Sequence, residues 1–164
     1  MNSQRGAHLG RAALRGMAAG LVGVAAMTGA EKVEQALTHR PSSYVPGRSL
    51  LTMMGRSVAD DDRPIVWNHA MHWGTGALLG ALRGVWAATG IRGPRANSVH
   101  TVVRLAFDQT MENATGAGAP PARWPAGEQL VDVTHKAIYS LVTGLVADRV
   151  IPPALRSERG VVSH

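Results

Sequence analysis

Four long stretches of apolar and small residues follow one another along the chain, separated by loops rich in glycine and proline. Each stretch is too long for a strand, and its few charged residues recur at helical spacing, so we expect four helices. The predicted helices span residues 9–37, 65–89, 97–115 and 127–151. Asn97 or Ser98 is the expected N-cap of the third helix, and two prolines after residue 151 end the fourth.

The chain reads as two similar halves, residues 9–90 and 97–151. Each half has a helix with a late glutamate, a loop with proline and aromatic residues, and a helix with an early histidine. If the helices of each half pack antiparallel, all four of these residues lie at one end of the fold. They are Glu34, His72, Glu112 and His135. The pattern therefore predicts an all-α, four-helix transmembrane bundle with pseudo-two-fold (2+2) symmetry.

The domain organisation expected from this pattern is simple. Residues 1–155 form a single four-helix domain, and residues 156–164 form a polar tail. The loop between the first two helices is the longest; within it, residues 50–54 predict a short covering helix, and residues 60–62 are three aspartates.

Composition narrows the class of protein. A chain of 164 residues without cysteine is one domain of ordinary size and has no disulfide or thiolate metal site. The net charge of +6 comes almost entirely from arginines, which lie singly at the ends of the stretches rather than along one helix face. Aromatic residues, at 4%, are too few to suggest base stacking, so we expect no nucleic-acid partner.

Three features favour a lipid bilayer as the partner. Small-residue ridges in the first two helices suit close packing in lipid, and they also offer Gly-rich faces for a homo-oligomer. Arginines are more numerous at the end that carries both termini, which predicts cytoplasmic termini, and most tryptophans fall at the opposite end. Mean hydropathy alone would select only the first two helices. The N-terminal run continues into a charged helical segment without a clear cleavage site, so we interpret it as the first helix.

The third helix carries a polar stripe at every fourth position: His100, Arg104, Asp108 and Glu112. Residues at this spacing share one helix face. In a membrane bundle the stripe would line the interior, with Arg104 neutralising Asp108, whereas in a soluble protein it would be a solvated outer face. Both alternatives stay open from the sequence.

The ionisable residues cluster at one end and predict a polar vestibule. Its expected residues are Glu34, His69, His72, Asp108, Glu112, Asp132 and His135. Ionisable groups in a membrane are costly unless they face the bundle interior or water, so we expect them to bind protons or cations for transport or sensing. Histidine, with an ordinary pKa near 6.5, would make such a site responsive to mild acid.

Two alternatives differ in class. Glu34, His72, Glu112 and His135 could hold a divalent transition metal, because carboxylate-bridged bundles use glutamates together with acid-x-x-His pairs; a haem between His72 and His135 is a related option. Otherwise the polar end only docks a partner, as in a structural or interaction protein. We expect no cofactor and no catalytic residues, since no serine or threonine has the spacing of a catalytic nucleophile.

The second half also resembles a known family. Thr115-Gly116, Pro120-Pro121 and Trp124-Pro125 precede Glu128 and His135 in a pattern similar to that of the YagU-type inner-membrane proteins of bacteria. The resemblance is carried mainly by the third and fourth helices, and Lys136 departs from it. It implies four hydrophobic segments and a place in the bacterial inner membrane, without an established activity.

Overall fold

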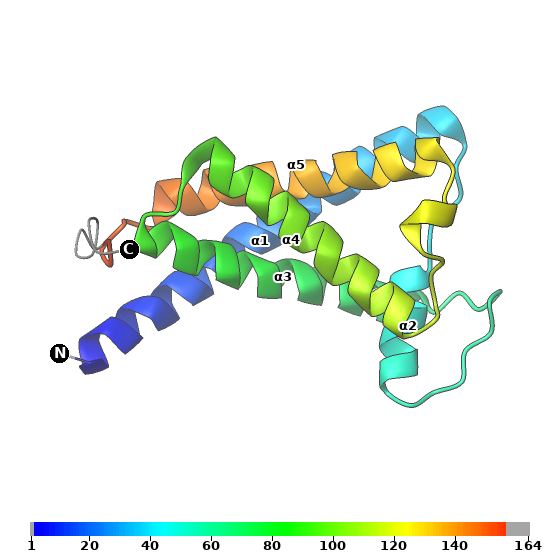
Figure 1. The fold of residues 1–164 in the computed structure, drawn as a ribbon, viewed down its shortest axis with the longest axis horizontal. Coiled ribbons are helices and arrows are strands. Elements are labelled where there is room, and N and C mark those ends of the chain that lie inside the picture. Colours follow the sequence, from blue (N-terminus) through cyan, green and yellow to red (C-terminus); the bar gives the residue numbers. More distant parts are fainter. Residues whose placement is uncertain (1, 157–164) are drawn as a thin grey trace.

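The computed structural model describes residues 2–156 and contains only helices as regular structure in that range (Figure 1). The elements are α1 (Asn2–Thr38), α2 (Val45–Met53), α3 (Ile65–Thr89), α4 (Gly93–Ala114), the 3-10 helix η1 (Pro121–Arg123) and α5 (Ala126–Val150). The predicted all-α fold is confirmed. The predicted polar tail lies, beyond Arg156, outside the described residues.

The helix boundaries differ from the prediction mainly at two N-termini. α4 begins at Gly93 because Pro94 occupies its first turn, where the fixed φ of proline suits a helix start. The expected cap Asn97 is instead inside the helix and buried. α1 begins at Asn2 rather than Leu9, so polar residues that carry no apolar pattern are helical as well.

The long helices run alternately in opposite directions, so the two ends of the bundle differ (Figure 1). At one end, which we call the terminal end, α1 begins and α5 finishes; Arg15 Nη1 donates to the Val150 carbonyl at 3.3 Å. At the other, the loop end, lie α2, η1 and residues 39–64 and 115–125 (Figure 1). α1 packs along α3 and α5, and α4 packs along α5. The two-fold relation between the halves stays a prediction.

α1 and α3 are joined by a glycine seam formed by Gly16, Gly20, Gly76, Gly80 and Gly84. A Cβ placed on Gly80 would lie 2.5 Å from the Gly16 carbonyl oxygen and 2.6 Å from the Gly20 Cα. The backbones therefore touch, and only glycine fits between them. These ridges serve a contact within one chain, and a homo-oligomer through Gly-rich faces stays a prediction.

Residues 39–64 fold over the loop end and are attached to α3. The Asn68 side chain accepts a hydrogen bond from the Gly47 backbone N–H at 3.0 Å and donates one to the Ser43 carbonyl at 3.2 Å. The predicted covering helix is present as α2, but it begins earlier, with Pro46 in its first turn. Residues 60–62 are exposed.

The interior of the bundle is polar along much of its length. Arg83, His100 and Tyr139 are fully buried, and Arg104 is 3% exposed. The buried apolar clusters are small and consist largely of alanines at the terminal end and of residues around Val24 near the middle. The half of the bundle away from the vestibule therefore holds buried polar and charged side chains as well as apolar ones.

The outer surface of the bundle has the opposite character. Within residues 65–89, 97–114 and 129–148, no Asp, Glu, Lys or Arg is exposed. Large apolar side chains are exposed there instead, among them Leu78, Val99, Val102, Leu141 and Leu145. The polar stripe of α4 faces inward, in agreement with the interior-lining alternative.

Two helices are long and apolar enough to cross a membrane, judged by length and composition: α1 over Gln4–Thr38, and α5 over Ala126–Val150. The sequence expectation named the first and second long helices, so it was wrong about the second. α3 is not among these two helices, because Asn68, two histidines and Arg83 lower the mean hydropathy of an otherwise apolar helix.

Candidate functional site

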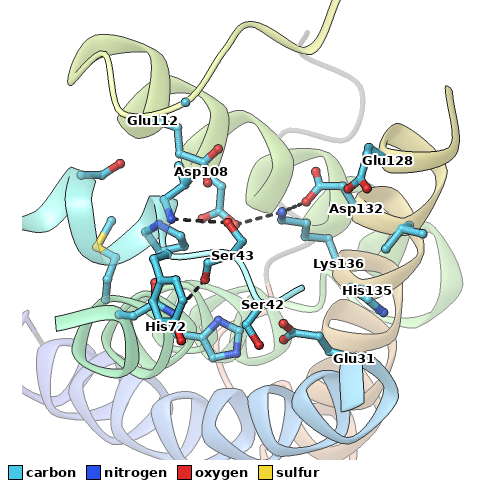
Figure 2. A pocket seen from close by; sticks show the side chains of 18 of the residues that line it. Glu31, Ser42, Ser43, His72, Asp108, Glu112, Glu128, Asp132, His135 and Lys136 are labelled. Atoms are coloured by element: carbon cyan, nitrogen blue, oxygen red, sulfur yellow. Dashed lines mark hydrogen bonds and ion pairs between the residues drawn. The ribbon is translucent and has the colours of Figure 1, made fainter. Parts of the chain in front are cut away.

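A cavity of about 540 Å³ opens at the loop end, and we call it the vestibule (Figure 2). All four long helices contribute to its walls, and the loops around Ser43 and Trp124 form its rim. Its charged and histidine side chains are Glu31, Lys32, Arg40, His69, His72, Arg104, Asp108, Glu112, Glu128, Asp132, His135 and Lys136. Antiparallel packing thus brings residues from distant parts of the sequence to one site.

Six of the seven predicted vestibule residues line this cavity: His69, His72, Asp108, Glu112, Asp132 and His135. The seventh, Glu34, is not among the lining residues. Its carboxylate instead pairs with Arg40 at 3.0 Å. The predicted set is therefore brought together, except that Glu34 supports a residue of the rim.

A chain of ion pairs links α4 to α5 in the vestibule (Figure 2). Arg104 donates to Asp108 at 2.9 Å, and Lys136 Nζ lies 3.6 Å from the same carboxylate oxygen. Lys136 also pairs with Asp132. The side chains of Arg104 and Lys136 are only 3% and 12% exposed, so each needs a partner to offset the loss of water. The four groups neutralise one another.

Arg40 connects α1 to α5 at the mouth of the vestibule. Its Nη2 lies 3.0 Å from a Glu34 oxygen, and its Nη1 lies 3.5 Å from Glu128. Hydrogen bonding to Glu34 raises the pKa of Arg40, which keeps this loop residue charged. The mouth is therefore held by a fixed positive charge between two carboxylates.

Glu112 differs from the other vestibule carboxylates on α4 and α5. It lies in the last turn of α4, where Gly118 of the following loop approaches its carboxylate. None of the ion pairs among residues 2–156 includes Glu112. Burial raises the pKa of Glu112 to about 7, although the nearby Lys136 acts in the opposite direction. This carboxyl group therefore gains or loses a proton near neutral pH.

The structure does not group the four residues proposed as metal ligands around one point within its described range. His72 Nε2 lies 3.1 Å from the Thr28 hydroxyl on α1, so a neighbouring helix occupies one of its ring nitrogens. Among the described residues, no three histidine or acidic side chains are grouped so as to hold a metal ion. Glu34, one of the four residues proposed as metal ligands, forms an ion pair with Arg40.

Polar side chains continue from the vestibule into the bundle. The Arg104 guanidinium carbon lies 4.9 Å from the centre of the Tyr139 ring, an arrangement that favours a cation–π interaction. The Tyr139 ring in turn lies 5.5 Å from that of His100, whose Nε2 is 3.0 Å from the Leu79 carbonyl. The Tyr139 hydroxyl donates to the Gly76 carbonyl at 2.7 Å, beside the glycine seam.

A second buried ion pair joins α3, α4 and α5 at the terminal end. Arg83 donates to Asp148 at 2.9 Å and to the Asn97 side chain at 3.0 Å. The same Asp148 oxygen accepts the backbone N–H of Gly93 at 2.9 Å. Asp148 therefore binds both the N-terminus of α4 and Arg83, the only charged residue of α3.

Sequence reasoning missed several residues that shape the site. Arg40 lies in an irregular loop, so no periodicity indicated where its side chain would reach. Glu31 lines the vestibule, although its place near the end of the first helix was the same signal that selected Glu34. The pair Arg83–Asp148 could have been found by applying the antiparallel argument to the other end of the bundle.

The chain matches no family model, no curated protein and no solved structure.

Proposed function

We propose that the protein is an integral membrane protein whose vestibule binds a proton at Glu112. The proposal of a membrane location rests on one observation: charged side chains lie inside the bundle, and apolar side chains cover its outer surface. Seven charged residues of α3, α4 and α5 face inward: Arg83, Arg104, Asp108, Glu112, Asp132, Lys136 and Asp148. In water a helix bundle exposes such residues, whereas a charge facing lipid costs about 2.5–3.5 kcal/mol or more.

The hydrocarbon layer in this proposal surrounds the bundle between the arginines of the terminal end and the vestibule. At 37 residues, α1 exceeds the roughly 20 residues needed to cross about 30 Å. The vestibule, with Glu112 in the last turn of α4, lies outside the spanning segments and open to water. The arginine excess at the terminal end favours cytoplasmic termini, and the resemblance to the YagU-type family favours the bacterial inner membrane.

Glu112, one of the seven residues expected from the sequence to bind protons or cations, carries the proton-binding part of the proposal. The carboxylates of Asp108 and Asp132 are already compensated by Arg104 and Lys136. Glu112 has no such partner within residues 2–156, so adding or removing its proton changes the net charge of the vestibule by one. Below a pH of about 7 it is neutral, and above that pH it is charged and favours a bound cation. This property suits an acid-responsive transporter or sensor.

The variant Glu112→Gln tests this assignment, because glutamine keeps the size of the side chain and cannot take up the proton. We expect the infrared band of a protonated carboxyl group in the reconstituted wild-type protein to disappear as the pH is raised through about 7. Glu112→Gln should lack this transition. The control Asp61→Asn removes an exposed carboxylate of the loop and should retain it. An unchanged transition in Glu112→Gln would refute the assignment.

A further inference from the structure

The terminal end of the bundle carries a second cavity, of about 230 Å³, which we call the basic crevice. It lies between the first half of α1 and the segment that follows α5. Its lining residues are His8, Arg11, Ala12, Arg15, Ala88, Ile151, Pro152, Ala154 and Leu155. One wall is therefore basic, and the rest is small and apolar.

The basic wall is formed by one face of α1. His8, Arg11 and Arg15 are three and four residues apart, so their side chains project from the same side of the helix. Both arginines are exposed, and neither makes an ion pair among the described residues. Arg15 reaches across the crevice to the Val150 carbonyl at 3.3 Å, which orients its guanidinium group toward the segment after α5.

The surroundings of the basic crevice strengthen its positive charge. Arg92, Arg95, Arg149 and Arg156 lie in the segments that end or begin helices at the same end of the bundle. Asp148, a nearby carboxylate, is shared by Arg83 at 2.9 Å and Arg92 at 3.9 Å, and one carboxylate cannot offset both arginines. Counting residues 2–156 alone, positive charges outnumber negative ones around the crevice, and a group that enters it meets a positive field, which selects an anion.

The same face of α1 continues away from the crevice as an apolar stripe. Ala18, Val22 and Ala25 follow Arg11 and Arg15 at helical spacing, and all three are exposed. A ligand with an anionic head group and an apolar chain would match the basic crevice and the apolar stripe next to it. Basic pockets between helices at a membrane surface bind lipid headgroups in this way.

We infer that the basic crevice binds the phosphate headgroup of an anionic membrane phospholipid, with Arg11 and Arg15 as its ligands and the stripe beyond them against an acyl chain. The inference rests on the membrane location proposed above, but not on proton binding at Glu112. The phosphate would accept hydrogen bonds from the two guanidinium groups, the geometry for which arginine is best suited.

Native mass spectrometry of the full-length protein in detergent tests the inference, with phosphatidylglycerol and phosphatidylcholine as added lipids. We expect the wild-type protein to bind phosphatidylglycerol more tightly than phosphatidylcholine. Each arginine near an anionic lipid raises the binding constant about fivefold, so Arg11→Gln/Arg15→Gln should bind phosphatidylglycerol about tenfold or more weakly. The matched control Arg56→Gln/Arg63→Gln removes the same charge at the loop end and should bind like the wild type. Arg11→Lys/Arg15→Lys keeps the charge and should retain part of the affinity.

Three results would overturn the inference: equal binding of the two lipids, equal loss in the control, or displacement of phosphatidylglycerol by an equal concentration of inorganic phosphate. The last would assign the crevice to a soluble phosphate. These results are separate from failure of the membrane proposal, which would appear as modification of cysteines on the outer surface of α4 and α5 by a water-soluble maleimide.

Discussion

Replacing Asp148 by asparagine is expected to lower the free energy of unfolding by about 3–5 kcal/mol, the range typical of breaking a buried ion pair. Arg83, fully buried, would keep its charge and lose the one anionic partner that it has in the described part of the chain. Asparagine is nearly the same size as aspartate, so the loss would report the charge and not a cavity. Chemical or thermal unfolding of the purified protein, followed by circular dichroism, measures the difference.

The double variant Arg83→Met/Asp148→Asn provides the decisive comparison. Methionine fills much of the arginine volume without a charge, so the double variant should be more stable than Asp148→Asn alone. Asp61→Asn, at an exposed position, should change stability by less than about 0.5 kcal/mol. If Asp148→Asn behaves like Asp61→Asn, the pair does not hold α3, α4 and α5 together.

Gly80→Ala is expected to cost about 2–3 kcal/mol of stability, toward the upper end of the range for overpacking. The added methyl group would lie 2.5 Å from the Gly16 carbonyl oxygen and 2.6 Å from the Gly20 Cα, and both are backbone atoms that no rotamer change can move. α1 and α3 would have to separate along the glycine seam. The same unfolding measurement applies.

Gly74→Ala is the matched control in the same helix. Nothing lies within 4 Å of the position that its Cβ would take. Since alanine favours a helix over glycine, this variant should gain up to about 1 kcal/mol. A neutral Gly80→Ala would contradict the backbone contact between α1 and α3, and a destabilising Gly74→Ala would contradict the open space beside that position.

The sequence predicted the long helices well because their ends are marked by proline, glycine and a change from apolar to polar residues. The boundaries of α3 agree with the prediction. The start of α4 was missed because Asn97 was weighed as a cap, whereas Gly93-Pro94 begins the helix and Asn97 accepts a hydrogen bond from Arg83. A capping residue type and a buried polar partner look alike in sequence.

Much of the vestibule could also be predicted, since it follows from helix direction alone. Residues near the same end of antiparallel helices meet, and this rule brought together His72, Glu112 and His135. The rule does not predict which side chains pair with one another. It therefore could not show that Arg40 forms an ion pair with Glu34, or that Lys136 forms one with Asp132. For the same reason it could not single out Glu112 as the one vestibule carboxylate of α4 and α5 that lacks an ion pair among the described residues.

The central claim is that lipid covers the apolar outer surface of the bundle, and cysteine accessibility tests it most directly because the chain has no cysteine of its own. Val102→Cys and Leu145→Cys place a thiol on the outer surface of α4 and α5, and Asp61→Cys places one in the loop. We predict that a water-soluble maleimide modifies only Asp61→Cys in membrane vesicles open to the reagent, and all three after unfolding. Modification of Val102→Cys and Leu145→Cys in the native protein as fast as Asp61→Cys would contradict the claim.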